Sequence, residues 1–278
     1  AVPAQVRTVA YGESFEPGGG VRARLVDAGH ILGSAIVELW LGAGGGQRKI
    51  VVTGDLGQPG RPIVRDPAVV AEADVLLLES TYGNRDHRPL GETLDELVTI
   101  LDHALNERRG MVIVPAFALG RTQEFLYYLN QLSRAGRVRD LNVFVDSPMA
   151  TEVTRITARH LELFDEEATR LAQETRPAPH LPRLRFTADV ADSMALNRLE
   201  GGAIIVAASG MCDGGRIRHH LKHHLPNPRT TVIMIGFQAA GTLGRRLVDG
   251  AETVRIFGED VPVRARVATL GGFSAHAD

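Results

Sequence analysis

The sequence has little cysteine and little lysine. Cys212 is the single cysteine among 278 residues, which excludes an internal disulfide framework and fits a reducing compartment such as the cytoplasm. Lysine occurs only at Lys49 and Lys222, so arginine supplies nearly all of the positive charge. Arginine suits bidentate contacts to phosphate, but a genome-wide compositional bias accounts for the excess at least as well.

Long apolar runs and a net positive charge are also missing. No stretch approaches the run of about 18 apolar residues that a membrane-spanning helix needs, and residues 1–10 lack the charged-then-apolar pattern of a signal peptide. The formal net charge is −2, so any binding of nucleic acid requires a local basic patch. With 44% hydrophobic residues, the chain can bury a large core in one or two domains.

Three segments in the first 60 residues have strand patterns. Arg22–Asp27 alternates its side chains, Ser34–Leu41 follows, and Lys49–Thr53 runs back after the glycine cluster at residues 42–46. These features predict antiparallel strands joined by a flexible turn. The glycine cluster lacks the Gly-Lys-Ser/Thr ending of a phosphate loop and opens no helix, which favours a hairpin turn.

From Gly91 onward, helical and strand patterns alternate. Apolar residues recur at helical spacing from Leu94 to Leu105, and further helices are predicted over residues 120–135, 149 to about 174, and 215–225. Apolar strands are predicted at residues 111–117, 142–145, 184–187, 203–209 and 230–237, with a proline-rich connector at 177–182. This alternation predicts a mostly parallel sheet covered on both faces.

Four polar residues stand where chemistry is expected. Val75–Leu78 has the pattern of a short buried strand, and Glu79 follows it, where a carboxylate is costly unless something binds or protonates it. His30 and Asp55 each follow a predicted strand, and His276 lies near the end of the sequence. Each has an ordinary alternative: a structural acid, a solvated histidine, a turn-forming aspartate, or a terminal histidine.

Four short segments, taken in order, carry a family resemblance: Asp27-Ala28-Gly29-His30, Thr53-Gly54-Asp55-Leu56-Gly57, the stretch around Glu79, and Phe273-Ser274-Ala275-His276-Ala277-Asp278. They resemble the metallo-β-lactamase-fold nucleases of the β-CASP family, which includes bacterial RNA-degrading enzymes and the endonuclease of mRNA 3′-end cleavage. The family's His-x-His-x-Asp-His zinc motif does not occur in this sequence. That motif and a further family histidine are expected beyond the two ends, as in the middle of a longer nuclease.

The resemblance implies an α/β fold with two parts. A partial metallo-β-lactamase-like αββα portion is expected over residues 1–87, and an inserted α/β β-CASP domain on a mostly parallel sheet over 88–272. Residues 273–278 are expected to return to the first domain. For Glu79 and His276 to share a site, the chain must leave the first domain after Glu79 and return just before His276. An active site between two domains gives a groove for an extended polymer.

The resemblance also implies roles for the four polar residues. His30 is expected to ligate one zinc ion and Asp55 to bridge two, so two zinc ions per active site are expected in the complete protein. A carboxylate has two oxygens for bridging, and a metal pair suits phosphodiester hydrolysis. Glu79 is expected to orient His276, which protonates the leaving group or holds the scissile phosphate. Asp55, Glu79 and His276 form the expected catalytic set.

The glycine-rich segment 208–216 follows a predicted strand and opens a helix. Free N–H groups at a helix start, with glycines that allow close approach, favour an anion. The alternative is a solvated basic face, and the histidine pairs 219/223 and 220/224 lack the third protein ligand of a zinc site. The residues expected to contact RNA here are Ser209, Gly210, Met211, Gly215, Arg216 and His220.

Arg121 and Ser147 stand at two further helix starts that resemble RNA-facing elements of the family. Arg121 follows a strand, and Ser147 precedes a proline in the first turn. Helix starts favour anions whatever their identity, but helix capping alone explains Ser147. Both residues are expected to contact phosphate.

These observations predict a zinc-dependent ribonuclease that hydrolyses RNA phosphodiester bonds by metal-activated water, in RNA processing or decay. The alternatives are a non-catalytic RNA-binding relative or fragment, and a DNA-processing nuclease of the same superfamily. Because the sequence lacks the main zinc motif, the chain as written is expected to be inactive if no other ligands replace it. The expected partner is RNA, single-stranded, in the cytoplasm; no membrane partner is expected, and a homo-oligomer is left open.

Overall fold

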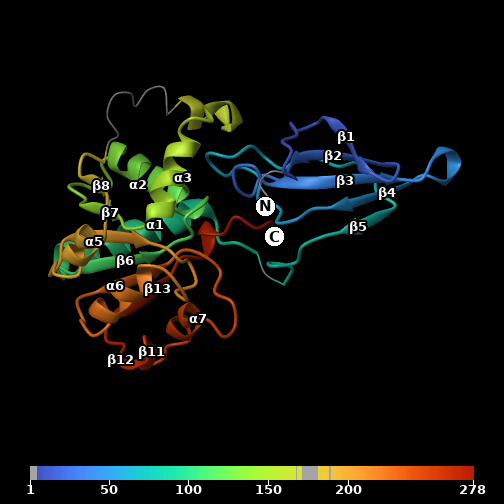
Figure 1. Cartoon of the computed structure of the whole chain (residues 1–278). Coiled ribbons are helices and arrows are strands. Elements are labelled where there is room, and N and C mark those ends of the chain that lie inside the picture. The colour runs from blue at the N-terminus through green and yellow to red at the C-terminus, as the bar shows by residue number, and fades with distance from the viewer. Residues whose placement is uncertain (1–4, 85, 167, 171–180, 188) are drawn as a thin grey trace. The chain divides into compact units, whose positions relative to one another are not determined.

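A computed structural model describes residues 5–84, 86–166, 168–170, 181–187 and 189–278 (Figure 1). The chain divides into two compact units. Unit 1 comprises Ala1–Asp86, Glu162–Thr169 and Ala275–Asp278, and unit 2 comprises His87–Leu161 and Arg170–Ser274.

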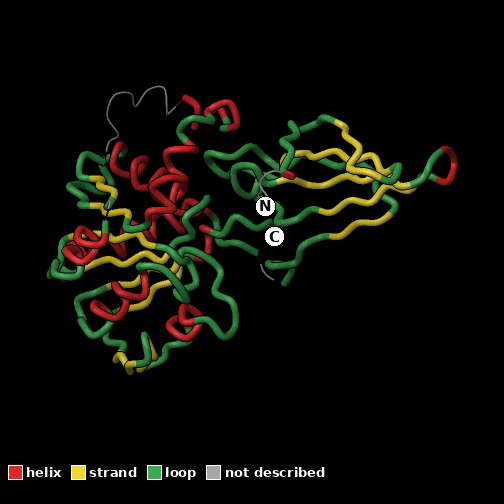
Figure 2. The backbone as a smooth tube through the Cα atoms, viewed as in Figure 1, coloured by secondary structure: helices red, strands yellow, loops and turns green. Residues whose placement is uncertain are grey.

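Unit 1 contains one five-stranded sheet, ordered β1-β2-β3-β4-β5. Neighbouring strands are antiparallel, except that β5 runs parallel to β4. A 3₁₀ turn at Gly44–Gly46 joins β3 to β4 (Figure 2). The antiparallel strands predicted for the first 60 residues are therefore present. The strands are β1 (Ser14–Gly18), β2 (Val21–Asp27), β3 (Ala35–Leu41), β4 (Arg48–Val52) and β5 (Val75–Leu77).

The sheet of unit 1 has a small core and an open edge. Its buried apolar cluster consists of Ala28, Ile36 and Val51. The prediction that Val75–Leu78 is buried is wrong, because these side chains are 48–60% exposed. The strand forms, but it is the edge of the sheet, and burial depends on neighbours that the run of apolar residues does not itself specify.

Unit 2 contains a six-stranded sheet ordered β13-β10-β6-β9-β7-β8. Every neighbouring pair in it is parallel, as the sequence predicts. A separate hairpin pairs β11 (Thr253–Ile256) with β12 (Glu259–Pro262). The six strands are β6 (Met111–Pro115), β7 (Val143–Val145), β8 (Leu184–Phe186), β9 (Ala203–Ala207), β10 (Thr231–Met234) and β13 (Arg266–Thr269).

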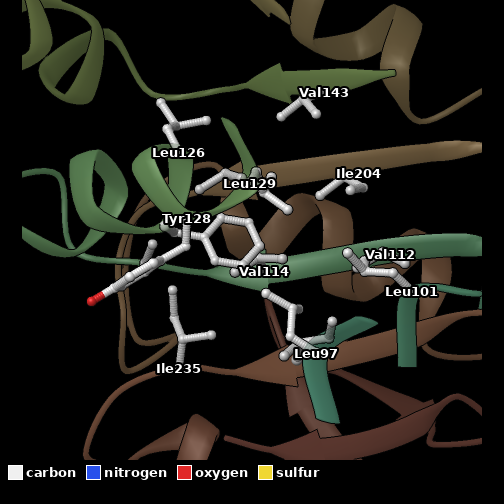
Figure 3. Close-up of a cluster of buried hydrophobic side chains, with 14 of the residues drawn as sticks. Leu97, Leu101, Val112, Val114, Leu126, Tyr128, Leu129, Val143, Ile204 and Ile235 are labelled. Carbon is white, nitrogen blue, oxygen red and sulfur yellow. The ribbon is translucent and has the colours of Figure 1, made fainter. Parts of the chain in front are cut away.

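Helices cover both faces of this parallel sheet because side chains along each strand alternate between faces. On β6, Val112 and Val114 join the cluster under α1 and α2, whereas Met111 and Ile113 join the cluster under α6 and α7. Figure 3 shows the first cluster. The helices are α1 (Leu90–Leu101), α2 (Arg121–Arg134), α3 (Pro148–Thr157), α5 (Val190–Leu196), α6 (Ile217–His224) and α7 (Leu243–Val248). A π-helical segment, Asp102–Glu107, continues α1.

The chain enters and leaves unit 2 at one place. A Cβ on Gly272 would lie 2.1 Å from Thr93 Oγ1 and 2.9 Å from the Arg88 carbonyl oxygen. Phe273 is fully buried, with its ring centroid 6.2 Å from that of Phe125 and 5.5 Å from that of Tyr128. The last residues of unit 2 therefore pack against its first helix and against α2.

One helix is shorter than predicted. Helicity from residue 149 was expected to continue to about residue 174, but α3 ends at Thr157 in tight turns in which Arg159 N donates to Ile156 O at 2.9 Å. A 3₁₀ turn follows at Leu161–Leu163, and residues 166 and 168–170 are helical again. The predicted end of the helix and most of the connector at 177–182 fall on residues 171–180, outside the described residues.

Candidate functional site

His30 lies in a tight turn directly after β2. Asp27 Oδ1 accepts a hydrogen bond from Gly29 N at 2.9 Å, and Ser34 Oγ accepts from His30 N at 3.1 Å and Ile31 N at 3.3 Å. Short polar side chains that bond to nearby backbone groups stabilise such turns. The turn fixes the backbone of His30, whose side chain is only 12% exposed.

Two glycines allow the His30 turn to touch the loop that carries Asp55. Gly29 has φ +64°, and a Cβ on Gly57 would lie 1.9 Å from the Gly29 carbonyl oxygen. Gly57 N donates to Ala28 O at 2.7 Å. Only glycine permits two backbones to approach this closely. Asp55 is thereby held beside His30, with His30 Nε2 3.9 Å from Asp55 Oδ2.

The last residues of the chain join the same loop. His276 forms an antiparallel bridge with Gly57, and Ala277 N donates to Leu56 O at 2.8 Å. The ring centroids of His276 and His30 lie 4.5 Å apart. Backbone pairing therefore holds His276 at the site, against the alternative of a loose terminal histidine.

Glu79 supports both neighbours. Its carboxylate accepts from Leu56 N at 2.6 Å and lies 2.9 and 3.0 Å from His276 Nδ1. Burial by itself raises the pKa of Glu79, but hydrogen bonds from Thr81, His276 and Leu56 together hold the pKa below its usual value. An ionised Glu79 fixes the His276 tautomer with hydrogen on Nδ1, which leaves Nε2 available for other contacts.

The donor atoms of His30, Asp55 and His276 all lie within 4.8 Å of one another. Imidazole and carboxylate are donors that zinc accepts, so His30 and Asp55 have the chemistry to hold a metal ion, and His276 lies beside them. Glu79 adds a carboxylate that orients the imidazole of His276. The structure thus brings together all four polar residues that the sequence singled out in this unit, and their chemistry fits a metal ion.

The second group of predicted residues lies in unit 2, where the strands of the parallel sheet end. After β9, Ser209 and Gly214 close a loop: Ser209 N donates to Gly214 O at 3.0 Å, and Gly214 N donates to Ser209 Oγ at 3.2 Å. A Cβ on Gly210 would lie 2.7 Å from the Phe117 ring, and one on Gly215, at φ +75°, would lie 2.2 Å from Ala208 O. Packing therefore requires both glycines.

Asp146 organises the start of α6, and sequence reasoning gave it no role. Its carboxylate is fully buried and accepts from Arg216 Nη1, Ser193 Oγ and His220 Nε2, each at 2.6 Å, and from Thr187 Oγ1. Burial by itself raises the pKa of Asp146, but these hydrogen bonds hold it well below the usual range. The sequence signal that could have identified Asp146 is its position directly after the buried strand β7.

Several expected phosphate contacts are engaged inside the protein instead. His220 is fully buried between Asp146 and Asn197, so the expected direct contact with RNA is wrong for this conformation. Arg121 is 8% exposed and pairs with Glu124 on its own helix. Ser147 accepts from Ala150 N at 3.2 Å as the N-cap of α3, the capping role that the sequence allowed.

The other expected contacts vary in exposure. Met211 is partly exposed, and its carbonyl accepts from Gly244 N at 3.0 Å. The Arg216 side chain is 19% exposed, with Nη1 held by Asp146. Cys212 is fully buried, and burial raises the pKa of its thiol to about 12, which disfavours a nucleophilic role.

Comparison with known proteins bears on these sites. Residues 122–247 match the model of the Beta-Casp domain. The chain is 39% identical over 272 residues to Ribonuclease TTHA0252 of Thermus thermophilus, across 98% of this chain and 61% of that protein. A Beta-Casp domain is therefore present in this chain. It is also 33% identical over 262 residues to an RNase J-like protein of Methanocaldococcus jannaschii, across 93% of this chain and 58% of the relative.

A third β-CASP relative is the transcription termination factor FttA of Pyrococcus abyssi, 33% identical over 286 residues, across 98% of this chain and 42% of that protein. The chain thus spans between 42% and 61% of the length of these three relatives. The family resemblance and the α/β fold class expected from the sequence are confirmed. None of the described helices is both long enough and apolar enough to cross a membrane.

Proposed function

We propose that this β-CASP chain contributes the site of a zinc-dependent ribonuclease that hydrolyses RNA phosphodiester bonds. The observation that carries the proposal is the convergence of His30, Asp55 and His276, with Glu79 behind His276. Relatives named as ribonucleases support the same reaction class. The cytoplasm is the proposed location, supported by the single buried cysteine.

His30 and Asp55 are proposed to hold the metal. The His30 turn and the Gly29–Gly57 contact keep the two donors together before any metal binds. When bound, zinc supplies an activated water and stabilises charge on the phosphate. Two zinc ions per site, as the resemblance implies for the complete protein, require donors in addition to these two residues.

His276 is proposed to hold the scissile phosphate or, when both of its ring nitrogens are protonated, to give the Nε2 proton to the departing oxygen. Glu79 accepts at Nδ1, so the imidazole is turned with Nε2 away from the carboxylate. A general acid must be positioned before its pKa matters. The backbone bridge to Gly57 supplies that positioning.

RNA contact in unit 2 is proposed at the loop of residues 209–216. Asp146 holds Arg216 at the start of α6, and Ser209 keeps the loop closed. Arg216 is the partly exposed cation of this group, so it is the residue proposed to meet a phosphate directly. Arg121, Ser147 and His220 then act by shaping the surrounding backbone.

The first test is the zinc content of the purified chain, measured by elemental analysis. We expect bound zinc in the wild type, a loss of zinc in Asp55→Ala, and no change in Glu72→Gln, an exposed control in the same unit. His276→Ala is expected to lower cleavage of a single-stranded RNA by about 100-fold or more while zinc remains bound. Loss of zinc in His276→Ala would instead assign this histidine as a ligand.

Near-zero zinc in the wild type would contradict the catalytic proposal for this chain. RNA binding that persists without zinc would then favour a non-catalytic RNA-binding protein. RNA and DNA oligonucleotides of one sequence separate the remaining alternative, because only RNA offers a 2′-hydroxyl. Equal cleavage of both would favour a DNA-processing nuclease.

A further inference from the structure

Trp40, the single tryptophan of the chain, lies on β3 among basic residues. The strand register places Arg22 opposite Trp40 on one side and Lys49 opposite Trp40 on the other. Arg24 lies opposite Glu38 on the same face, because side chains two residues apart share a face of the sheet. We call Arg22, Arg24, Trp40 and Lys49 the basic–aromatic patch.

All three cations of the patch lie close to the indole. The Arg22 guanidinium carbon is 4.3 Å from the Trp40 ring centroid, that of Arg24 is 5.6 Å away, and Lys49 Nζ is 5.4 Å away. Trp40 is half-buried, and one cation beside such a ring contributes about 0.5–2 kcal/mol.

The patch carries surplus positive charge. Glu38, 1% exposed, is the carboxylate that the patch surrounds; Arg24 Nε lies 2.5 Å and Lys49 Nζ 2.7 Å from its oxygens. Burial raises the pKa of Glu38, but the bonds to Arg24 and Lys49 outweigh it and keep the group ionised. No described carboxylate pairs with Arg22, which is exposed. Three cations therefore face one acid, in a chain whose net charge is −2.

We propose that the basic–aromatic patch binds single-stranded RNA, with its cations at phosphates and Trp40 beside a base. Single-strand binding sites combine a positive surface with aromatic side chains, which stack on any base. An acidic protein segment would use the charge but not the indole. The proposal extends the proposed function, since it assumes that RNA is the substrate of this chain.

The patch is a contact outside the metal-ligand cluster. Trp40 lies five residues along β3 from Ala35, which is about 17 Å at the rise of a strand, and the His30 turn precedes Ala35. In Figure 1, β3 and β4 lie side by side and are joined by the glycine turn at Gly44–Gly46. RNA held here would be anchored at a distance from the bond that is cleaved.

Trp40 makes the proposal directly testable, because intrinsic tryptophan fluorescence reports on this patch alone. The protein is titrated with a single-stranded RNA dodecamer at low salt while the anisotropy of a 3′ dye on the RNA is recorded in parallel. We expect saturable quenching that follows the anisotropy curve. Arg22→Ala should reduce the slope of log affinity against log salt by about 0.7, the value for one phosphate contact on a single strand.

Two variants sharpen the test. Trp40→Ala should weaken binding by about fivefold or more if a base stacks there, whereas Trp40→Phe should preserve most of the affinity. Arg48→Ala is the matched control, since Arg48 is on the same strand as Lys49, points to the other face and pairs with Asp74. It should leave both signals unchanged.

Anisotropy that rises while fluorescence stays constant would overturn the patch and leave the proposed ribonuclease function intact. No rise in anisotropy at low salt would overturn both proposals. Equal quenching by polyglutamate, which has charge but no bases, would overturn the assignment to RNA.

Discussion

The two sheets of this chain are protected in different ways. The parallel sheet of unit 2 has an apolar cluster on each face, formed with α1 and α2 on one side and with α6 and α7 on the other. The sheet of unit 1 buries the small group Ala28, Ile36 and Val51 and exposes β5 at its edge. Hydrophobic burial thus dominates unit 2, while backbone contacts and polar turns fix much of unit 1.

The two units also differ in how far their central carboxylates are buried. Asp146 is fully buried, and its partners satisfy both of its oxygens. Asp55, in unit 1, has a side chain that is 67% exposed. A buried, fully bonded carboxylate is a structural element, whereas an exposed one beside two imidazoles remains free to bind a ligand.

The largest expected effect is in unit 2. Asp146→Ala removes the acid that Arg216 and His220 share and leaves buried donors without an acceptor, so we expect a loss of about 3–5 kcal/mol in the free energy of unfolding. Urea denaturation followed by circular dichroism measures it. Asp260→Ala, at an exposed position in the same unit, should change stability by less than about 0.5 kcal/mol. Equal effects in both variants would contradict the role given to Asp146.

The second prediction separates the units. Ile36→Ala should cost unit 1 about 2–5 kcal/mol, because few other buried side chains share its cluster. Tryptophan fluorescence follows unit 1 through Trp40, and the helical circular dichroism signal mainly follows unit 2. We expect the fluorescence transition to move to lower urea while the helical transition stays in place. A common shift of both would show that the units unfold together.

The third prediction concerns pH. His224 is 4% exposed, and burial together with His220 and His223 lowers its pKa to about 4. In the unfolded chain His224 has the ordinary histidine pKa of about 6.5, so as the pH falls the unfolded state takes up a proton before the folded state does. Unit 2 therefore has its full free energy of unfolding above about pH 6.5 and loses roughly 3 kcal/mol of it as the pH falls toward 4. His224→Gln should flatten that difference, and His219→Gln, at an exposed site, should not. Parallel pH curves for wild type and His224→Gln would refute the assignment.

The smallest expected effect is at the edge of unit 1. Leu76 is 56% exposed on β5, and open apolar edge strands promote pairing between molecules. Leu76→Lys should change the free energy of unfolding by less than about 0.5 kcal/mol but reduce self-association measured by light scattering. Val69→Lys, 95% exposed and outside the sheet, should leave self-association unchanged.

The sequence predicted what local patterns and short motifs encode. The hairpin strands, the parallel sheet and the grouping of His30, Asp55, Glu79 and His276 all follow from such signals. The hairpin β11–β12 and the short helix α7 were not predicted, because elements of four to six residues carry little periodicity.

What the sequence could not show were contacts between distant segments. The burial of His220 depends on Asp146, which lies 74 residues away in the sequence. The identity of neither residue predicts that the two side chains pair. The exposure of β5 likewise depends on its neighbours in the sheet. Periodicity describes an element, but burial and pairing are properties of the assembled fold.

The contact between Gly272 and the start of α1 has a consequence for how this protein matures. Glu79 and His276 are 197 residues apart, and closing so long a loop from an unfolded chain is entropically unfavourable. Once the intervening unit has folded, its entry and exit are already adjacent, and only short tethers remain to be ordered. We therefore expect the Glu79–His276 pair to form late in folding, after residue 276 has been synthesised and unit 2 has folded.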